Sequence, residues 1–327
     1  MQLPPEVQCV FTTDSTVHAM SDSNTSTTTT TTSGAAILID TATNPSAMAT
    51  SNAVTARSMA PALSRPQTFE LDCALTYEVK GPTDFLFQIH AQNGMDQQVF
   101  SELLVITPDL PRHVYADPTV GHRFLRLHAD AGVIGLRYQA RVTRTVVPAD
   151  ANAAEVPIAQ IPDELLHNLN PTRYCESDLL GPAAQRLFSN LPHGHARVQA
   201  IVEWIHENVD YRIGSSDATT TARDVFVRRA GVCRDFAHLG VTFCRALNIP
   251  ARLVVGYAKF DEPPPDFHAV FEAYIGGRWV MFDATFMSPI DELVRIATGR
   301  DAKDVAFATI FGPATMTAMC PLIRKVD

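Results

Sequence analysis

Of the six cysteines in the sequence, Cys233 is the one whose surroundings suit a nucleophile. It follows Gly231, which permits a tight turn, and it precedes apolar residues at helical spacing from Phe236 to Leu247. A thiol at a helix start faces free backbone N–H groups, but a helix dipole contributes at best about 2 kcal/mol. An unperturbed thiol is only a few per cent ionised at neutral pH. Nucleophilic chemistry at Cys233 therefore requires an imidazole beside the sulfur.

His268 is the histidine that local geometry ties to an acid. It lies in a β-rich run that ends at Gly276-Gly277, a two-residue hairpin signal. If these glycines form the turn, Ile275 pairs with Arg278, and counting back places His268 diagonal to Asp283. Diagonal Cβ atoms lie about 7 Å apart, which one hydrogen bond between an imidazole and a carboxylate can span. Asp283 is therefore predicted to fix the tautomer of His268.

The same register predicts which other side chains share the face of His268. Side chains two residues apart on a strand point to one side, so Glu272 and Trp279 are expected on that face, where they would shape the cleft. A base and its orienting acid would then need only a thiol delivered by a helix packed against that face. We therefore predict a catalytic triad of Cys233, His268 and Asp283.

The elements that position these residues can be predicted from hydrophobic spacing. One helix is expected over 198–209, ending near Tyr211, and another from about Cys233 until Pro250 stops it. Three β-rich runs follow, at 251–258, 267–275 and 278–282. Helices followed by antiparallel strands indicate the α+β fold class, with a central helix packed on an antiparallel sheet.

The first half of the chain differs from the second in composition and in the spacing of its apolar residues. Residues 1–66 are rich in Ser, Thr and Ala and predict a disordered low-complexity tail. Short alternating or β-branched runs, separated by turn residues, follow at 68–79, 84–90, 102–106, 123–128 and 133–147. These runs predict an N-terminal antiparallel β-sandwich over 67–150, and the core of helices and strands is expected over 151–327.

Charge and composition exclude several classes of protein. With 26 Lys and Arg against 35 Asp and Glu the net charge is −9, which disfavours nucleic acid and anionic membrane surfaces as partners. No run of 18 apolar residues and no signal sequence is visible, so a cytoplasmic location is expected. The cysteines include no C-x-x-C pair and are expected to be free thiols. No cofactor and no metal are predicted, because His193, His195 and His238 lack further ligands at suitable spacing.

Four short motifs resemble one known family: 229–237 (RAGVCRDFA), 249–252 (IPAR), 267–269 (FHA) and 280–285 (VMFDAT). They look like the transglutaminase-like superfamily of papain-type cysteine enzymes, with the Cys, His and Asp in the same order. The β-rich region resembles the N-terminal domain of bacterial members, and RYCESD at 173–178 resembles the entry to the core. Altogether the resemblance covers residues 68 to about 312.

The resemblance implies a role for each residue of the triad. Cys233 would be the nucleophile, His268 the general base and then acid, and Asp283 the group that orients the imidazole. The Cys233 N–H would be one oxyanion donor. Animal members use an upstream aromatic residue as a further donor, which has no assigned match here. Animal members also need calcium, but the sequence contains no EF-hand pattern.

The sequence leaves the reaction open. Thiolate attack on a carboxamide or peptide bond of a protein or peptide substrate would form an acyl-thioester. An amine would resolve it by transglutamination, and water would resolve it in a cysteine protease or amidase. A non-catalytic binding module that uses the sandwich for protein contacts is the alternative from another class. The substrate and the oligomeric state are not encoded in any pattern that we find.

Overall fold

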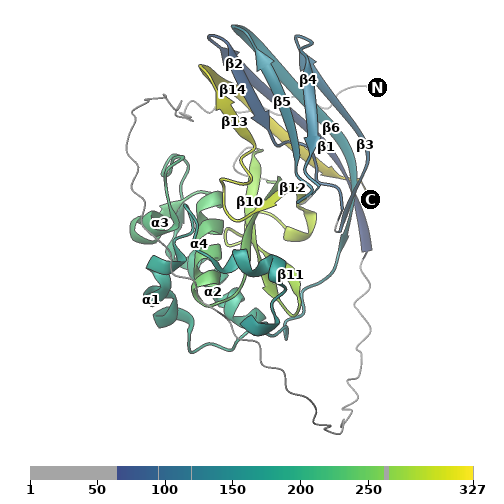
Figure 1. Cartoon of the computed structure of the whole chain (residues 1–327). Coiled ribbons are helices and arrows are strands. Elements are labelled where there is room, and N and C mark those ends of the chain that lie inside the picture. Colours follow the sequence, from purple (N-terminus) through teal and green to yellow (C-terminus); the bar gives the residue numbers. More distant parts are fainter. Residues whose placement is uncertain (1–64, 95, 119, 261–264, 327) are drawn as a thin grey trace, which may run out of the picture.

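Two four-stranded antiparallel sheets lie face to face and form a β-sandwich above a mixed helical and β core (Figure 1). The structure is a computed structural model, and it describes residues 65–94, 96–118, 120–260 and 265–326. Rings from the two sheets meet between them, as where Tyr77 contacts Phe85 with 5.4 Å between centroids. The predicted tail over 1–66 lies almost wholly outside the described residues.

The strands of the sandwich pair across long sequence distances. The first sheet has the order β14 (Ala314–Lys325), β1 (Arg65–Val79), β6 (Gly132–Val146) and β3 (Gln97–Thr107). The second has the order β13 (Ala308–Phe311), β2 (Thr83–Phe87), β5 (Arg123–Ala129) and β4 (Arg112–Ala116). All five predicted runs overlap a strand. The remaining N-terminal strand, β4, was not predicted because all its residues are exposed and it shows no alternation.

The C-terminus of the chain returns to the sandwich. Strand β14 pairs antiparallel with β1 from Ala314 opposite Val79 to Lys325 opposite Phe69, and β13 pairs with β2. This pairing corrects the expectation that the core extends over 151–327, since the last strands complete the N-terminal domain instead. Without β14, the backbone of β1 would present an open edge, and unpaired edges favour aggregation.

The core contains four α-helices and one larger sheet. The helices are α1 (Ser177–Phe188), α2 (His195–Asn208), α3 (Ala222–Arg228) and α4 (Cys233–Ala246). Its sheet has the order β11 (Arg278–Phe282), β10 (Phe267–Ile275), β9 (Ala251–Tyr257) and β12 (Val294–Gly299). Shorter elements are β7 (Asp210–Tyr211), β8 (Ala230–Gly231) and the 3-10 turns η1 (Ile158–Gln160), η2 (Asp163–Leu169) and η3 (Ile290–Glu292).

These elements confirm the α+β class and a sandwich followed by a helix-and-sheet core. The two predicted helices correspond to α2 and α4, and the three predicted runs correspond to β9, β10 and β11. No helix within the described ranges is both long enough and apolar enough to cross a bilayer.

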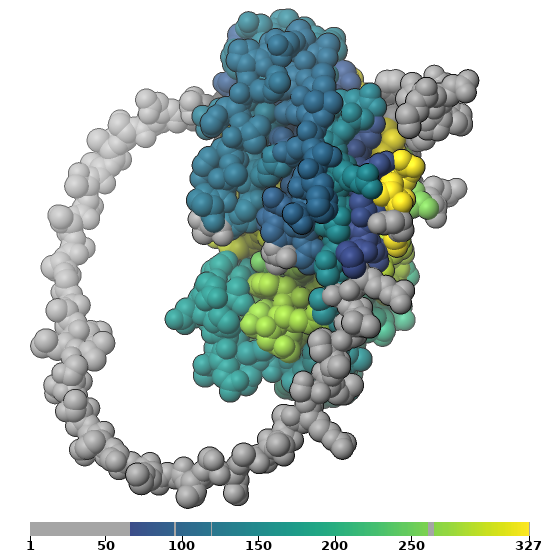
Figure 2. All heavy atoms as spheres, turned by 90° about the vertical axis from the view of Figure 1, so that its right-hand side faces the viewer, coloured from purple at the N-terminus to yellow at the C-terminus, as the bar shows by residue number. Residues whose placement is uncertain are grey.

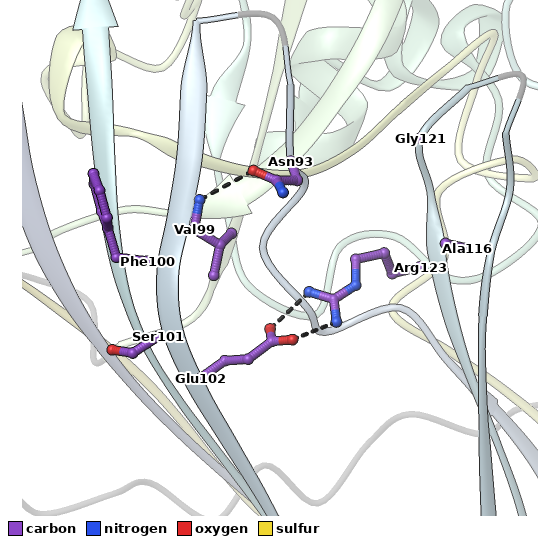
Figure 3. Close-up of a pocket in the computed structure, with 8 residues that line it drawn as sticks. All are labelled: Asn93, Val99, Phe100, Ser101, Glu102, Ala116, Gly121 and Arg123. Atoms are coloured by element: carbon purple, nitrogen blue, oxygen red, sulfur yellow. Dashed lines mark hydrogen bonds and ion pairs between the residues drawn. The ribbon is translucent and has the colours of Figure 1, made fainter.

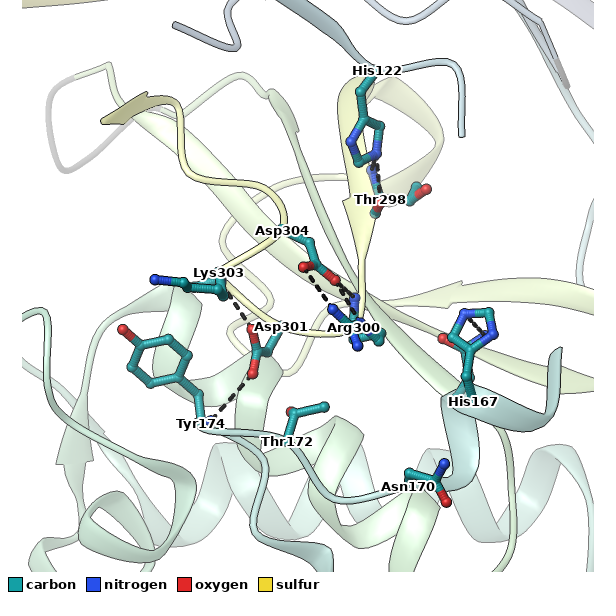
Figure 4. Close-up of polar contacts among 12 residues, drawn as sticks. His122, His167, Asn170, Thr172, Tyr174, Thr298, Arg300, Asp301, Lys303 and Asp304 are labelled. Carbon is teal, nitrogen blue, oxygen red and sulfur yellow. Dashed lines mark hydrogen bonds and ion pairs between the residues drawn. The ribbon is translucent and has the colours of Figure 1, made fainter. Parts of the chain in front are cut away.

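Polar contacts hold the sandwich to the core at the end of β12 (Figure 4). The imidazole of His122, which precedes β5, hydrogen-bonds to the backbone of Thr298, with 2.6 Å between Nε2 and the carbonyl oxygen. In the following loop the Asp301 carboxylate accepts the N–H groups of Tyr174 at 3.2 Å and Lys303 at 2.8 Å. The segment that enters the core is thus held against the loop that leaves its sheet.

Candidate active site

The start of α4 presents Cys233 at a defined place. Strand β7 pairs in parallel with β8, and Cys233 is the first residue of α4 and is half-buried. The Asp235 carboxylate accepts the N–H of Val232 at 2.9 Å, which satisfies one of the free donors at the helix start. A Cβ atom on Gly231 would lie 2.7 Å from the Cβ of Asp235, so only glycine fits there. The close approach of the Asp235 side chain to the backbone therefore explains why glycine occupies position 231, whereas the sequence suggested a tight turn.

His268 and Asp283 are joined as the hairpin register predicts. Ile275 is opposite Arg278, which confirms the predicted register. The His268 Nε2 and an Asp283 carboxylate oxygen are 2.8 Å apart, and both side chains are nearly inaccessible to solvent. The other Asp283 oxygen accepts the N–H and the hydroxyl of Thr285 at 2.8 and 2.7 Å. Both oxygens of Asp283 are therefore fixed in place.

Thr285 was not identified from the sequence as a residue of the site. The hydrogen bond from its N–H to Asp283 has the form of an Asx turn, in which an aspartate side chain accepts from the backbone two residues on. The Asp-x-Thr sequence at 283–285 is therefore the signal that could have found it.

The thiol of Cys233 lies against the imidazole of His268. Burial disfavours the charged imidazole, but hydrogen bonding to Asp283 and Cys233, and the charges of both, raise the pKa of His268 to about 10. The Nδ1 atom is buried and has no hydrogen bond of ordinary geometry, so it is the nitrogen open to the thiol. The ring of Phe260 packs edge-to-face against the His268 ring, with 5.0 Å between the ring centroids, and shields one side of the imidazole. The structure thus brings the three predicted residues together.

The thiol reaches the imidazole by a different route from the one expected. Helix α4 packs on the face of β10 that carries Phe271, where a Cβ on Gly240 would lie 2.5 Å from the Phe271 ring. Alternation along the strand puts His268 on the opposite face. The expectation of a helix packed against the His268 face is therefore wrong. Cys233 and His268 meet because α4 and β10 both begin at this point of the core.

Tyr211 is a residue of the site that sequence reasoning did not assign. The backbone N–H and the side chain of Cys233 both lie close enough to its hydroxyl to affect the pKa of Tyr211. Burial, followed by the charge of the Cys233 side chain, raises the pKa of Tyr211. The β7–β8 pairing, with Tyr211 opposite Gly231, holds the ring in place. A two-residue parallel strand pair leaves no periodic signal, so this aromatic residue could not be assigned from spacing.

Two family profiles match the chain in the regions just described. The transglutaminase-like superfamily profile matches residues 182–284, and the profile of the bacterial transglutaminase N-terminal domain matches 67–164. A solved structure of a candidate cysteine protease from Cytophaga hutchinsonii is 42% identical, with a TM-score of 0.77. That similarity covers 81% of this chain and 92% of the other. The chain belongs to the transglutaminase-like superfamily.

Curated relatives are similar over a shorter region. An uncharacterized protein of Mycobacterium leprae is 28% identical over 148 residues, which is 42% of this chain and 52% of the relative. An uncharacterized protein of Mycobacterium tuberculosis is 31% identical over 115 residues, or 31% of this chain and 37% of the relative. The matches thus span about half the length of these curated relatives or less.

Glu272 and Trp279, expected to shape the cleft of this transglutaminase-like chain, belong to a buried ion-pair cluster. The fully buried Glu272 carboxylate binds Arg252 at 2.7 Å and also binds Arg295. Trp279 lies beneath the Arg252 guanidinium, 4.1 Å from ring centroid to cation. Arg295 in turn binds Asp96 of the sandwich. This cluster joins the core sheet to the sandwich, and its contacts give Glu272 and Trp279 a structural role.

The other described cysteines of the transglutaminase-like chain are not placed for chemistry. Cys73, Cys175 and Cys244 are buried free thiols. Burial raises the pKa of the first two to about 12 and also raises the pKa of Cys244. Cys320 in β14 is disulfide-bonded, which corrects the expectation of a free thiol there. The sixth, Cys9, lies outside the described residues.

The histidines considered for a metal site have other contacts. His238 is fully buried, stacks on Tyr174 with 5.2 Å between ring centroids, and accepts the N–H of Ala302 at 3.1 Å. Burial lowers its pKa. His193 lies 3.1 Å from the Glu155 carboxylate. Within the described ranges, no three His, Cys, Asp or Glu side chains are grouped to hold a metal ion.

Proposed function

We propose that this chain catalyses thiol-dependent acyl transfer on a carboxamide or peptide bond of a protein or peptide substrate. The observation that carries the proposal is the line of contacts from the Cys233 thiol through the His268 ring to Asp283, with Asp283 fixed by Thr285. A buried imidazole with a high pKa is suited to hold the proton of an adjacent thiol.

In the first half of the reaction, His268 takes the proton of Cys233, and the sulfur attacks the carbonyl carbon. The imidazolium then gives this proton to the departing amine, which leaves an acyl-thioester on Cys233. In the second half, an amine or a water molecule attacks the thioester and loses a proton to His268. The thiolate departs, and the thiolate–imidazolium pair is restored. Asp283 keeps the ring oriented throughout.

Two donors adjoin the place where the oxyanion would form. The Cys233 N–H lies near the Tyr211 oxygen, and an oxyanion bonded to the attacked carbon would accept a hydrogen bond from this donor. The Tyr211 hydroxyl is then free to donate to the same oxyanion. We therefore propose Tyr211 as the second donor, the role that the sequence left unassigned.

A cysteine protease or amidase using the same residues is the second candidate. It is favoured by the Cytophaga hutchinsonii structure, which is described as a candidate cysteine protease and is 42% identical. The two activities differ in the acyl acceptor, which is water in one case and an amine in the other. They share every step up to the acyl-thioester.

Iodoacetamide labelling at neutral pH, mapped by mass spectrometry, tests the shared step. Cys233 should label far faster than Cys73, Cys175 and Cys244, and His268→Ala should slow the labelling of Cys233. Equal rates at all these thiols in the folded protein would instead indicate a non-catalytic binding module.

A glutaminyl peptide then separates the two enzyme classes. Incorporation of a fluorescent amine into the peptide would support transglutamination. Cleavage or deamidation without incorporation, at saturating amine, would support a protease or amidase. A Cys233→Ala variant is the blank for both readouts.

A further inference from the structure

A hollow of about 400 Å³ opens beside Asp283, between α2 and the segment that follows β11. We call it the β11 pocket. Its lining includes the apolar side chains of Val202, Phe286, Met287 and Ile290 and the polar residues Asp283 and Ser288. Figure 2 shows the yellow-green part of the core, which contains β11, at the surface below the sandwich. The β11 pocket is thus mainly apolar and touches the group that orients His268.

One polar atom of the β11 pocket has no partner. Ser288 is only 8% exposed, and its hydroxyl makes no hydrogen bond to any described residue. A buried hydroxyl left unpaired is unfavourable, so such a group in a pocket wall points to a ligand that supplies the missing bond. By contrast, Phe286 is 54% exposed at the rim, where a large apolar side chain gains by being covered.

A second hollow, in the sandwich, is lined by polar groups that bind one another and serves as a comparison (Figure 3). Its volume is similar, about 430 Å³, and it lies along β3. The Arg123 guanidinium binds both Glu102 oxygens, at 2.7 and 2.5 Å, and the Asn93 side-chain oxygen accepts the Val99 N–H at 3.1 Å. These polar groups already bind each other. Volume alone therefore does not single out the β11 pocket, whereas its unpaired hydroxyl does.

The position of the β11 pocket suits a substrate held at the thiol. Asp283 forms part of its wall and is bonded to the imidazole that contacts Cys233. An extended peptide advances about 3.3 Å per residue, so a side chain two or three residues from the reacting carbonyl can span the width of the His268–Asp283 pair.

We propose that the β11 pocket is a subsite for a bulky apolar side chain of the peptide substrate. The Ser288 hydroxyl donates a hydrogen bond to a backbone carbonyl of that peptide. This inference rests on the proposed acyl transfer at Cys233 and names its substrate class. Filling the pocket also removes water from beside Asp283, and lower water content strengthens its electrostatic hold on His268.

The test compares peptidyl chloromethyl ketones that carry Leu, Gly or Asp two or three residues from the reacting carbon. The rate of Cys233 alkylation in the full chain is measured for each. We expect the Leu peptide to react about tenfold faster or more than the Gly and Asp peptides, as apolar pockets discriminate by such factors. Equal rates for the three peptides would overturn the subsite.

Variants locate the preference within the molecule. Phe286→Asp and Ile290→Asp should abolish the advantage of the Leu peptide, because both residues lie at the partly exposed rim. Phe311→Asp is the matched control, since Phe311 is 63% exposed on β13 in the sandwich, and it should leave the preference intact. A loss of preference in the control as well would count against the β11 pocket.

Ser288→Ala separates ligand binding from structure. Removing an unpaired buried hydroxyl should leave the melting temperature unchanged or raise it, while slowing the Leu peptide severalfold. A lower melting temperature with an unchanged peptide preference would contradict the role of Ser288.

Iodoacetamide distinguishes failure of the subsite from failure of the proposed function. Fast labelling of Cys233 by iodoacetamide, together with indifference to the peptide side chain, would overturn the subsite alone. Slow labelling of Cys233 by both reagents would overturn the acyl transfer and the subsite with it.

Discussion

His268 and Glu272 lie four residues apart on one face of β10, and both are almost completely buried, yet their surroundings differ. The Glu272 carboxylate is held by Arg252 and Arg295, so its charge is matched on both oxygens. His268 has Asp283 on one nitrogen, while its other nitrogen is open to a thiol. A buried charge that is fully paired holds a structure together, and one with an open position can take part in chemistry.

The partners of the two residues also come from different parts of the fold. Glu272 is linked through Arg295 to Asp96 of the sandwich, so its cluster spans the two domains. His268 contacts Asp283, Cys233 and Phe260, all within the core. Substitutions near Glu272 should therefore change stability, and substitutions near His268 should change reactivity.

The largest expected effect is at His268. We expect His268→Ala to lower turnover about a thousandfold or more, because it removes the group that takes and returns the proton. Steady-state kinetics with a glutaminyl peptide measures it, and circular dichroism checks the fold. His128→Ala, an exposed histidine on β5, is the control and should keep full activity. Full activity of His268→Ala would contradict the catalytic role that distinguishes His268 from Glu272.

Tyr211→Phe should have the next largest effect. Loss of one oxyanion donor typically costs about a hundredfold in kcat, and we expect a decrease of that size with little change in melting temperature, since the side chain is partly exposed. Tyr115→Phe, 49% exposed on β4 of the sandwich, is the matched control. An unchanged kcat in Tyr211→Phe would exclude the hydroxyl as a donor.

Glu272→Gln should act on stability. Breaking a buried ion pair by removing one partner costs about 3 kcal/mol or more, and here it leaves Arg252 and Arg295 without their shared carboxylate. Urea unfolding measures the change in free energy. Glu70→Gln, which disrupts an exposed pair with Arg324, should cost under about 1 kcal/mol. Equal costs at the two sites would show that burial does not set the value of the Glu272 pairs.

The pH dependence of stability should reflect the raised pKa of His268. The folded protein raises the pKa of His268 to about 10, so the charged imidazole stabilises the folded state. This contribution is fully present below about pH 6.5, the unfolded value, and is lost as the pH rises through about 10. The stability difference between wild type and His268→Gln should therefore shrink steadily between pH 7 and 10. A stability difference that increased between pH 7 and 10 would contradict a raised pKa of His268 in the folded state.

The hairpin was predictable because its geometry is local. A two-residue Gly-Gly turn fixes the register of the strands on either side, and that register determines that His268 meets Asp283. The strands of the sandwich were predictable where one face is buried, as along β6, whose buried residues alternate. The exposed strand β4 and the C-terminal strand β14 were not predicted. In β4 all residues are exposed, so buried and exposed positions do not alternate. For β14 the partner lies about 250 residues earlier in the chain, and hydrophobic spacing carries no information on such pairing.

The sequence by itself determined the reactive residue types, the helix start at Cys233 and the pairing of His268 with Asp283. Each of these depends on neighbours within a few residues or on one short turn, where backbone geometry leaves few choices. Only the tertiary structure decided that Tyr211 contacts Cys233, that Ser288 lacks a partner beside Asp283, and that the C-terminus closes the sandwich. These features depend on how separate elements pack, and the packing follows from the shape of the whole core, which the spacing of residues in one segment does not specify.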